Sequence, residues 1–166
     1  MNDEPVIRLA SATDLAKLKE IINLSFPRFF RFFAKRSADS EEGKVLVAEE
    51  RGGIAGFAKL IEFLIADKKY GCILWLAVHP NCRRRGFASI LVEAGFGELK
   101  RAGAVAIFAS VQRQNKASLG VFAKKGFFRT GFVYLLRVFG WRALQLCADI
   151  WYAPSEVILM RFDEKT

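Results

Sequence analysis

Apolar residues recur along the chain with two different periods, which predict an alternation of strands and helices. Short apolar runs bounded by Gly, Pro or charged clusters are typical of strands. The near-continuous run Cys72–Val78 indicates a strand that is buried on both faces. The expected strands are Pro5–Leu9, Lys44–Glu49, Ile54–Ile65, Cys72–Val78, Ala104–Val111, Phe127–Phe139 and Glu156–Phe162.

Apolar positions at helical spacing predict about four helices between these strands. The first helix follows the N-cap candidates of Ser11–Asp14, and Pro27 ends it. The four helices are expected over Leu15–Phe26, Arg28–Arg36, Phe87–Lys100 and Asn115–Lys125. Trp141–Ile150 carries a weaker pattern that is consistent with a further short amphipathic helix.

The order of these elements predicts one domain built on a mixed sheet. Hairpins flank a single strand–helix–strand crossover, so the parallel pair of strands is expected near the centre of the sheet. No repeat, low-complexity run or linker interrupts residues 1–166, and this length suits a single domain. The composition is 52% hydrophobic and 13% aromatic, which is enough to fill a core and excludes a disordered chain.

The formal charge of +9 and the pI near 9.7 predict an anionic ligand or partner. Charge alone leaves a nucleotide cofactor, a nucleic acid and an acidic membrane face open. The chain lacks a run of about 18 uncharged apolar residues, and its acidic start lacks the layout of a signal peptide. We therefore expect a cytoplasmic protein with no membrane span. Cys72, Cys82 and Cys147 are odd in number and widely spaced, which favours free thiols over disulfides or a metal site.

A basic loop follows the predicted buried strand and leads directly into a helix. It reads Arg83-Arg84-Arg85-Gly86-Phe87-Ala88. A helix N-terminus presents unpaired N–H groups and a partial positive charge, and a glycine lets the backbone approach a ligand closely. Three arginines add formal charge. The junction therefore predicts a pyrophosphate site that needs no metal.

A second pattern lies one strand later, in Asn115 to Phe127. Together with Val78-His79-Pro80 and the Arg83–Ala88 loop, this segment resembles the ordered motifs of the GNAT superfamily of N-acetyltransferases. The resemblance implies an α/β (α+β) chain with the GNAT acyl-CoA N-acyltransferase fold. In that fold a mixed sheet of about seven strands is splayed in the middle and flanked by about four helices. It also implies an acetyltransferase that uses acetyl-CoA as co-substrate and no metal.

The resemblance further implies which residues bind the cofactor. Backbone amides of the loop would hold the pyrophosphate, and the backbone of Leu76 and Val78 would bond to the pantetheine arm. An N–H near Leu76 would polarise the thioester carbonyl. The implied cofactor-binding residues are Leu76, Val78, Arg83, Arg84, Arg85, Gly86, Phe87, Ala88, Asn115, Ser118, Phe122 and Lys124.

Two positions depart from the family pattern, and both concern proton transfer. At the position of Phe122, many members of the family have a tyrosine that protonates the departing CoA thiolate. The branch that acetylates protein N-termini commonly places at Ser110 a glutamate that serves as base. Other groups must then move the proton, and the candidates are Glu62 as base, His79 as a second base and Tyr134, on the predicted strand 127–139, as acid. Each also has a purely structural interpretation.

The leading hypothesis is an enzyme that moves an acetyl group from acetyl-CoA to a primary amine by direct attack on the thioester. The acceptor is either a protein N-terminus or a small amine. Because Phe122 and Ser110 depart from the pattern, a GNAT-fold protein that binds CoA or acyl-CoA with little or no catalysis is the alternative. A basic nucleic-acid-binding module would rest on charge and on the aromatic-basic segment Phe29–Arg36. It leaves Asn115–Phe127 unexplained, so nucleic acid is not the expected partner. A homodimer remains open.

Overall fold

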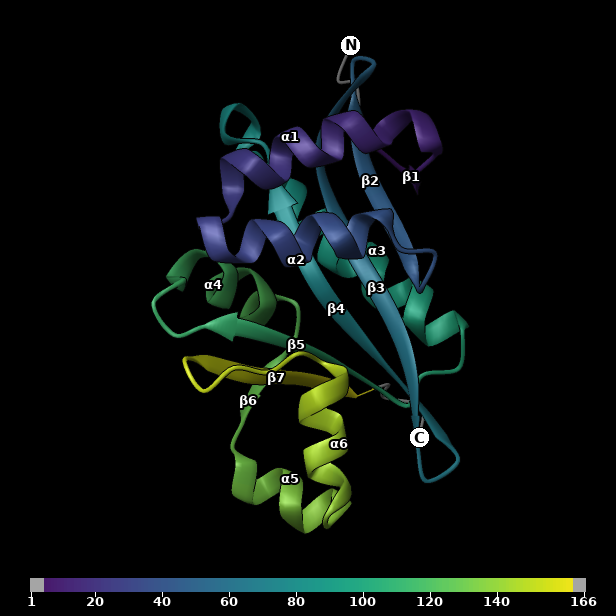
Figure 1. The fold of residues 1–166 in the computed structure, drawn as a ribbon, viewed down its shortest axis with the longest axis vertical. Helices are drawn as coiled ribbons and strands as arrows, with labels where there is room; N and C mark the ends of the chain where they lie inside the picture. The colour runs from purple at the N-terminus through teal and green to yellow at the C-terminus, as the bar shows by residue number, and fades with distance from the viewer. Residues whose placement is uncertain (1–4, 163–166) are drawn as a thin grey trace. The chain divides into compact units, whose positions relative to one another are not determined.

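The computed structural model describes residues 5–162, in which a seven-stranded sheet is accompanied by six α-helices. The strand order is β1-β2-β3-β4-β5-β7-β6 (Figure 1). The strands are β1 (Val6–Leu9), β2 (Lys44–Glu50), β3 (Gly53–Ile65), β4 (Lys68–Val78), β5 (Ala106–Gln112), β6 (Phe128–Thr130) and β7 (Glu156–Phe162). The helices are α1 (Leu15–Ser25), α2 (Arg28–Asp39), α3 (Phe87–Arg101), α4 (Lys116–Lys124), α5 (Phe132–Phe139) and α6 (Arg142–Asp149). Two short 3₁₀ turns, η1 (Ala12–Asp14) and η2 (Pro80–Cys82), complete the described elements.

The sheet is mixed, as the order of elements predicts. Gly71 and Cys72 of β4 pair in parallel with Ile107 and Phe108 of β5. The β1–β2, β2–β3, β5–β7 and β6–β7 pairs are antiparallel. The residues divide into two compact units. The first contains the chain up to Ile61 together with Trp75–Gly95, and the second contains Glu62–Leu74 together with the chain from Phe96 onward.

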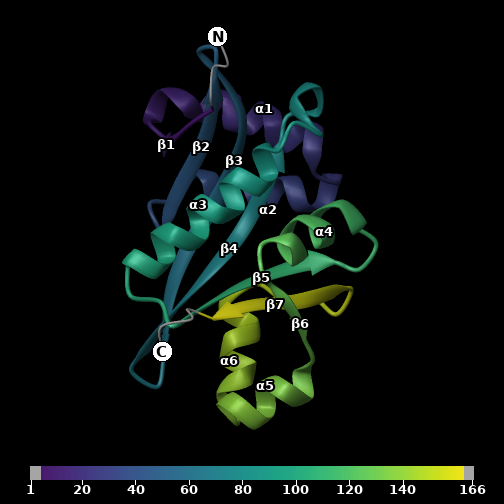
Figure 2. The ribbon, with the colours of Figure 1, turned by 180° about the vertical axis from the view of Figure 1, so that it is seen from behind.

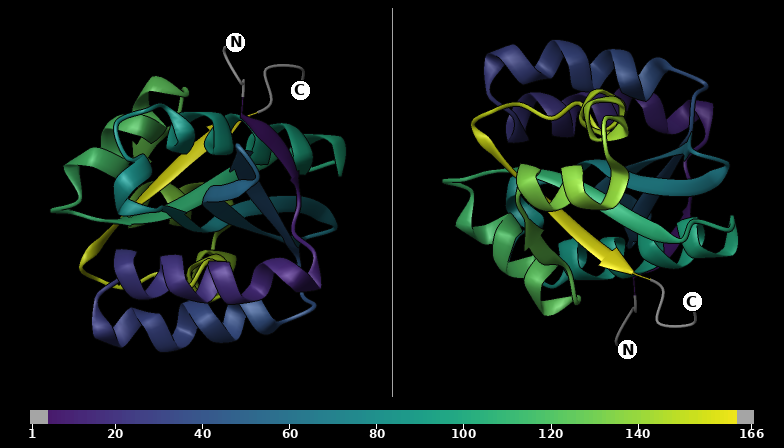
Figure 3. Two further views of the ribbon diagram at one scale, coloured as in Figure 1. Left: turned by 90° about the horizontal axis from the view of Figure 1, so that it is seen from above. Right: turned by 90° about the horizontal axis from the view of Figure 1, so that it is seen from below.

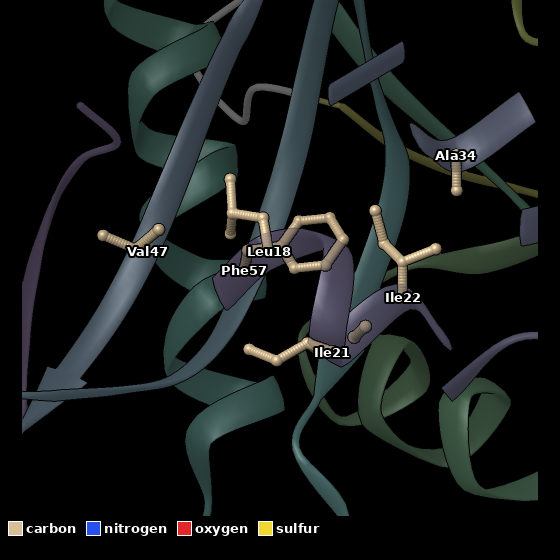
Figure 4. Packing of buried hydrophobic residues seen from close by; sticks show 7 residues of the cluster. Leu18, Ile21, Ile22, Ala34, Val47 and Phe57 are labelled. Carbon is tan, nitrogen blue, oxygen red and sulfur yellow. The ribbon is translucent and has the colours of Figure 1, made fainter. Parts of the chain in front are cut away.

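The first unit has an apolar core between its strands and a pair of helices. Helices α1 and α2 pack against each other on one face of β2 and β3, and the first turns of α3 lie on the other face (Figure 3). Side chains at helical spacing on α1 meet inward-facing side chains of the strands because the apolar stripe of the helix can only be buried there. Figure 4 shows this cluster, which consists of Leu18, Ile21, Ile22, Ala34, Val47, Phe57 and Ala77.

One glycine of the first unit permits a close approach of two strands. A Cβ added to Gly56 of β3 would lie 2.6 Å from the carbonyl oxygen of Ala77 and 3.1 Å from the side chain of Val78, on β4. Backbone oxygen cannot move aside as a flexible side chain can, so a larger residue at position 56 would push the end of β4 away. That end leads directly into the basic loop.

The second unit has an aromatic core. Phe139 of α5 contacts Tyr70 of β4 and Phe108 of β5 with ring centroids 5.4 and 6.3 Å apart. On the opposite face, Phe96 of α3 contacts Phe127, which precedes β6. Figures 2 and 3 show α4 on this second face of β5 and β7, and α6 on the first. Alternate residues of β5 and β7 therefore face two different layers of helix.

The structure corrects one predicted strand. Phe127–Phe139 was expected to be a strand, but the strand β6 ends at Thr130 and Phe132–Phe139 forms helix α5. Gly131 adopts an extended conformation and its carbonyl accepts the first helical hydrogen bond, from Leu135 N–H at 3.1 Å. Phe132, Leu135, Leu136 and Phe139 fall at i, i+3, i+4 and i+7, so the apolar run has the helical period as well as strand composition.

The number of helices also differs from the expectation. About four were predicted, and six are present within residues 5–162 because α5 and α6 form a helical hairpin between β6 and β7. The weaker amphipathic pattern of Trp141–Ile150 is confirmed as α6. No helix in the described part of the chain is long and apolar enough to cross a bilayer.

Candidate cofactor and acetyl-transfer site

The basic loop has the backbone conformation of an anion-binding turn. Arg84 and Gly86 have positive φ angles of 60° and 86°, and α3 begins at Phe87 with its first helical bond running from Ile90 N–H to the carbonyl of Gly86 at 3.1 Å. Alternation of left-handed residues with ordinary ones turns successive N–H groups toward one point. The amides of the first turn of α3 lack intrahelical acceptors by construction. The loop can therefore hold an anion by its backbone.

The arginine side chains of the loop have different roles. Arg85 donates to both carboxylate oxygens of Glu50 on β2, at 2.6 and 2.7 Å, and its guanidinium lies 5.3 Å from the ring centroid of Phe87. The Nε of Arg83 donates to the carbonyl of Val78 at 3.3 Å. Arg85 thus ties the loop to β2 and Arg83 ties it to the end of β4, while both side chains remain exposed.

The end of β4 in the first unit carries the predicted pantetheine contacts. Leu76 and Val78 are half-buried, and the carbonyl of Val78 accepts from the hydroxyl of Ser25 at 3.4 Å as well as from Arg83. His79 follows directly. Its backbone N–H donates to the carbonyl of Ala55, and its Nδ1 accepts from Asn81 N–H at 3.2 Å as the cap of η2. These bonds give His79 a structural role in the turn.

The predicted cofactor residues of α4 lie in the second unit. The Oδ1 of Asn115 accepts from the backbone N–H of Ser118 at 3.1 Å, so these two residues form the N-cap of α4. Phe122 is buried, with its ring centroid 5.0 Å from that of Phe127, whereas Lys124 is exposed. A cap of this kind is worth about 1 kcal/mol to a helix. The pattern Asn-x-x-Ser therefore has a local structural cause in addition to any contact with a ligand.

Two of the predicted proton-transfer residues, Glu62 and Tyr134, lie in exposed surroundings. Glu62 is exposed on β3 and forms an ion pair with Lys69, with Oε2 and Nζ 3.2 Å apart. Tyr134 lies on α5 and not on a strand, and its side chain is 39% exposed. Neither residue has the fixed, partly desolvated surroundings that tune a catalytic group.

A carboxylate that the sequence analysis missed stands beside Ser110. The hydroxyl of Ser110 on β5 donates to Oε2 of Glu156 on β7 at 2.5 Å, and the backbone N–H of Ala153 donates to the same oxygen at 3.0 Å. Glu156 is buried, with 9% of its surface exposed. The position that carries a glutamate in one branch of the family thus carries a serine bonded to a glutamate from the neighbouring strand.

The sequence held a signal for Glu156. Ile158 and Met160 are buried on the same face of β7 and share the phase of Glu156, so a charged residue occupies an inward-facing position. Buried carboxylates need partners, which predicts a hydrogen-bonded role for such a residue. Its partner could not be identified, because the pairing of β5 with β7 is a property of the tertiary fold.

Two cysteines of the second unit are poor nucleophiles. Burial, and to a lesser extent the negative charge of Glu156, raises the pKa of the fully buried Cys72 thiol far above its usual range. Burial also raises the pKa of Cys147. Because the thiolate is the reactive form, neither residue suits a covalent acetyl-cysteine intermediate. Direct attack of the amine on the thioester remains the simpler chemistry.

Comparisons with known proteins agree with this geometry. The model of the Acetyltransferase (GNAT) family matches residues 13–127, which is more than half of the chain. The L-methionine sulfoximine/L-methionine sulfone acetyltransferase of Salmonella typhimurium is 26% identical over 134 residues, covering 73% of this chain and 78% of that protein. The uncharacterized N-acetyltransferase YhfO of Bacillus subtilis is 25% identical over 140 residues, covering 77% of this chain and 93% of that protein.

Solved structures show the same fold. The PaiA N-acetyltransferase of Thermoplasma acidophilum, in complex with coenzyme A, superposes with a TM-score of 0.69 at 17% identity and covers 96% of this chain and 99% of its own. The ribosomal-protein-S18-alanine N-acetyltransferase of Escherichia coli superposes with a TM-score of 0.65 at 19% identity, covering 98% of both chains. With the loop, the mixed sheet and the family match in agreement, this chain belongs to the acetyltransferase (GNAT) family and is an N-acetyltransferase that uses acetyl-CoA.

Proposed function

We propose that the protein acetylates a primary amine, either a protein N-terminus or a small amine, by direct attack on the thioester of acetyl-CoA. The observation that carries the proposal is the loop of Arg84 and Gly86 at the start of α3, where positive φ angles and a helix N-terminus coincide. Such a loop holds a pyrophosphate by its backbone and needs no metal.

The residues of the loop fit a pyrophosphate on two counts. A Cβ added to Gly86 would meet nothing within 4 Å, so the approach to its backbone is open. The side chain of Arg85 is bonded to Glu50 and that of Arg83 to Val78, so we assign the phosphates to the backbone amides and to Arg84. The family resemblance assigns Leu76 and Val78 to the pantetheine arm, and Asn115, Ser118, Phe122 and Lys124 to the helix side of the cofactor. Those assignments are part of the proposal.

We assign the role of general base to Glu156. An amine must lose a proton before or during attack, and a carboxylate fixed by Ser110 and Ala153 can accept it directly or through one water. Both of these hydrogen bonds go to Oε2, and we assign Oε1 as the acceptor of the proton. Glu62 and His79 remain the second and third candidates, since Glu62 is exposed and His79 caps a turn.

Phe122 cannot protonate the departing thiolate, because it is buried and its side chain has no proton to give. Tyr134, the candidate acid from the sequence, lies on α5 and is 39% exposed. Water can serve in its place, because a thiolate is a tolerable leaving group near neutral pH. We therefore expect no protein acid to be essential.

The test is release of CoA from acetyl-CoA in the presence of a panel of amines. The panel holds free amino acids, methionine sulfone, alkylamines and peptides with free N-termini. Turnover with any of them supports the enzyme. Binding without turnover across the panel would favour the alternative, a protein that binds CoA with little catalysis.

A thermal shift separates both hypotheses from a protein without a CoA site. Acetyl-CoA at about 100 times its Kd adds roughly 2.7 kcal/mol to the free energy of unfolding. No stabilisation at millimolar acetyl-CoA would contradict both. Desulfo-CoA and free adenosine serve as controls, because they separate recognition of the pyrophosphate from recognition of the thiol and of the base.

A further inference from the structure

The α5–α6 hairpin exposes a set of large apolar side chains in the second unit. Trp141, at the bend between the helices, is 85% exposed, Val133 is 64% exposed and Leu144 is 55% exposed. We call this set, with its two arginines, the hairpin surface. It consists of Phe132, Val133, Tyr134, Arg137, Val138, Trp141, Arg142 and Leu144.

The hairpin surface is not a failure of the helices to pack. Leu135 of α5 and Leu146 of α6 are fully buried, and α5 and α6 pack against each other. Helix α5 therefore exposes several apolar side chains in addition to those that fill the core, and α6 adds Leu144. An apolar surface of this size indicates an interaction surface, because soluble proteins rarely leave one uncovered.

The net charge of the chain comes from one stretch of sequence that includes the hairpin. From Leu99 to Ala148 the sequence has nine Lys and Arg residues and no Asp or Glu. The formal charge of this stretch is therefore +9, which equals the charge of the whole chain. The remaining residues carry seventeen basic and seventeen acidic side chains and balance one another. The hairpin itself contributes Arg137 and Arg142, on either side of Trp141.

We propose that the hairpin surface binds an anionic lipid bilayer and lies in its interfacial plane. Trp141 and its apolar neighbours enter the boundary between headgroups and acyl chains, where an indole is favoured. Arg137 and Arg142 extend from the same hairpin to lipid phosphates and carboxylates. No helix of residues 5–162 is long enough to cross the bilayer, so the contact is peripheral.

Two observations favour a lipid surface over a second copy of the chain. A symmetric dimer through the hairpin would place Arg137 and Arg142 of both copies, four positive charges, in one interface. The hairpin has no acidic residue before Asp149 with which to compensate them. The family match ends at Phe127, so the hairpin lies outside the segment that the family shares. It can therefore carry a property of this protein that is separate from acetyl transfer.

The experiment measures co-sedimentation of the whole chain with two kinds of vesicle. One kind is pure phosphatidylcholine, and the other contains about 30% phosphatidylserine. We expect at least tenfold tighter binding to the anionic vesicles at about 0.1 M salt, and a loss of most of that preference at about 0.5 M, where screening is stronger. Equal binding to both vesicles, or none to either, would overturn the proposal.

Two paired variants assign the binding to the hairpin. Trp141→Ser with Leu144→Ser removes apolar contacts, and Arg137→Gln with Arg142→Gln removes two charges. Each pair should lower the partition coefficient at least tenfold and leave stabilisation by acetyl-CoA unchanged, which verifies that the variants fold.

The matched controls lie on α2, where Phe29 is 70% exposed among arginines. The first control pair is Phe29→Ser with Phe32→Ser, and the second is Arg28→Gln with Arg36→Gln. The partition coefficient of each pair onto anionic vesicles should stay within about twofold of the parent's. If the α2 variants lose binding and the hairpin variants keep it, the surface is wrongly assigned. A dimer in sedimentation velocity that Trp141→Ser dissociates would likewise reject the lipid surface in favour of a second copy.

Discussion

Ser110 and Glu156 bring a carboxylate from one strand beside a serine on the neighbouring strand. A glutamate is expected at position 110 from one branch of the family, and the chain has a serine there. The serine donates a 2.5 Å hydrogen bond to Glu156, which is buried on β7. Pairing of Ser110 with Ile158 in the β5–β7 register brings the two residues within reach.

The first prediction concerns Glu156. Glu156→Gln should lower kcat by about 100-fold or more, the usual contribution of a general base, and should change the affinity for acetyl-CoA little. Glu62→Gln is the matched control and should retain most of the rate. Equal rates for Glu156→Gln and the parent at every pH would remove Glu156 from the mechanism.

The second prediction concerns Asp14 in the first unit. Asp14 accepts from Arg8 at 2.7 and 3.0 Å, and from the N–H and hydroxyl of Ser11. The hydrogen bond from Arg8, followed by that from the Ser11 backbone, holds the pKa of Asp14 well below its usual range. Asp14→Asn should therefore cost about 1–2 kcal/mol of unfolding free energy at neutral pH.

The pH dependence gives the sign of that effect. A lowered pKa in the folded state stabilises the protein above the unfolded pKa of about 4, and the stabilisation is lost as the pH falls below it. The difference in free energy of unfolding between the parent and Asp14→Asn, measured by urea unfolding, should therefore shrink below about pH 4. Asp39→Asn, which removes an exposed ion pair with Lys19, should cost less than about 0.5 kcal/mol at either pH.

At the scale of an element, the loop before α3 works through its backbone. Arg84 is held at a positive φ without being glycine, and such a conformation costs about 1–2 kcal/mol for a residue with a Cβ. Arg83 and Arg85 offset part of that cost by bonding the loop to Val78 and Glu50. A strained, bonded loop at a helix start is a preorganised ligand site.

The third prediction follows from that backbone. Gly86→Ala should weaken acetyl-CoA binding at least tenfold in calorimetry, because φ of 86° is strained for alanine and relaxation would turn the amides away. Gly97→Ala in the interior of α3 is the control, and it should bind normally and unfold at slightly higher temperature. If both variants bind alike, the amides of the loop are not the anion site.

At the scale of the whole molecule, the charge of +9 bears on the acceptor. Glu49 and Glu50, two carboxylates that could have attracted a polycation, are each paired with an arginine, at 2.7 and 2.6 Å. We therefore expect the net positive charge to disfavour a cationic acceptor. An acceptor with acidic groups is attracted by the same charge, and a neutral acceptor is neither attracted nor repelled.

The fourth prediction compares two peptide acceptors with the same N-terminal residue. At about 0.05 M salt, kcat/KM should be higher for a peptide with acidic residues downstream than for one with lysines. The ratio should approach one as salt rises to about 0.5 M, because screening shortens the range of the field. A preference for the basic peptide that persists at high salt would indicate a dedicated acidic subsite in place of the overall field.

Local chemistry determined much of this protein from its sequence alone. The basic loop and the helices that follow Gly86 and Asn115 depend on neighbouring residues, and each lies where the pattern predicted. The hydrophobic period placed β7 at Glu156–Phe162 for the same reason. The run after Thr130 was misread, because apolar residues at both strand and helical spacing leave the choice to packing. Leu135 and Phe139 gain a buried aromatic layer only as a helix.

Tertiary structure alone decided which distant residues meet. Ser110 and Glu156 are 46 positions apart, and nothing in their local sequence names the partner. Their contact depends on the antiparallel register of β5 and β7, which many side chains set together. The exposure of Trp141 also depends on tertiary structure. Only the packing of the helical hairpin decides which of its apolar side chains are buried and which stay exposed. A backbone turn at the start of a helix can therefore be predicted from the sequence, and a contact between residues of two strands cannot.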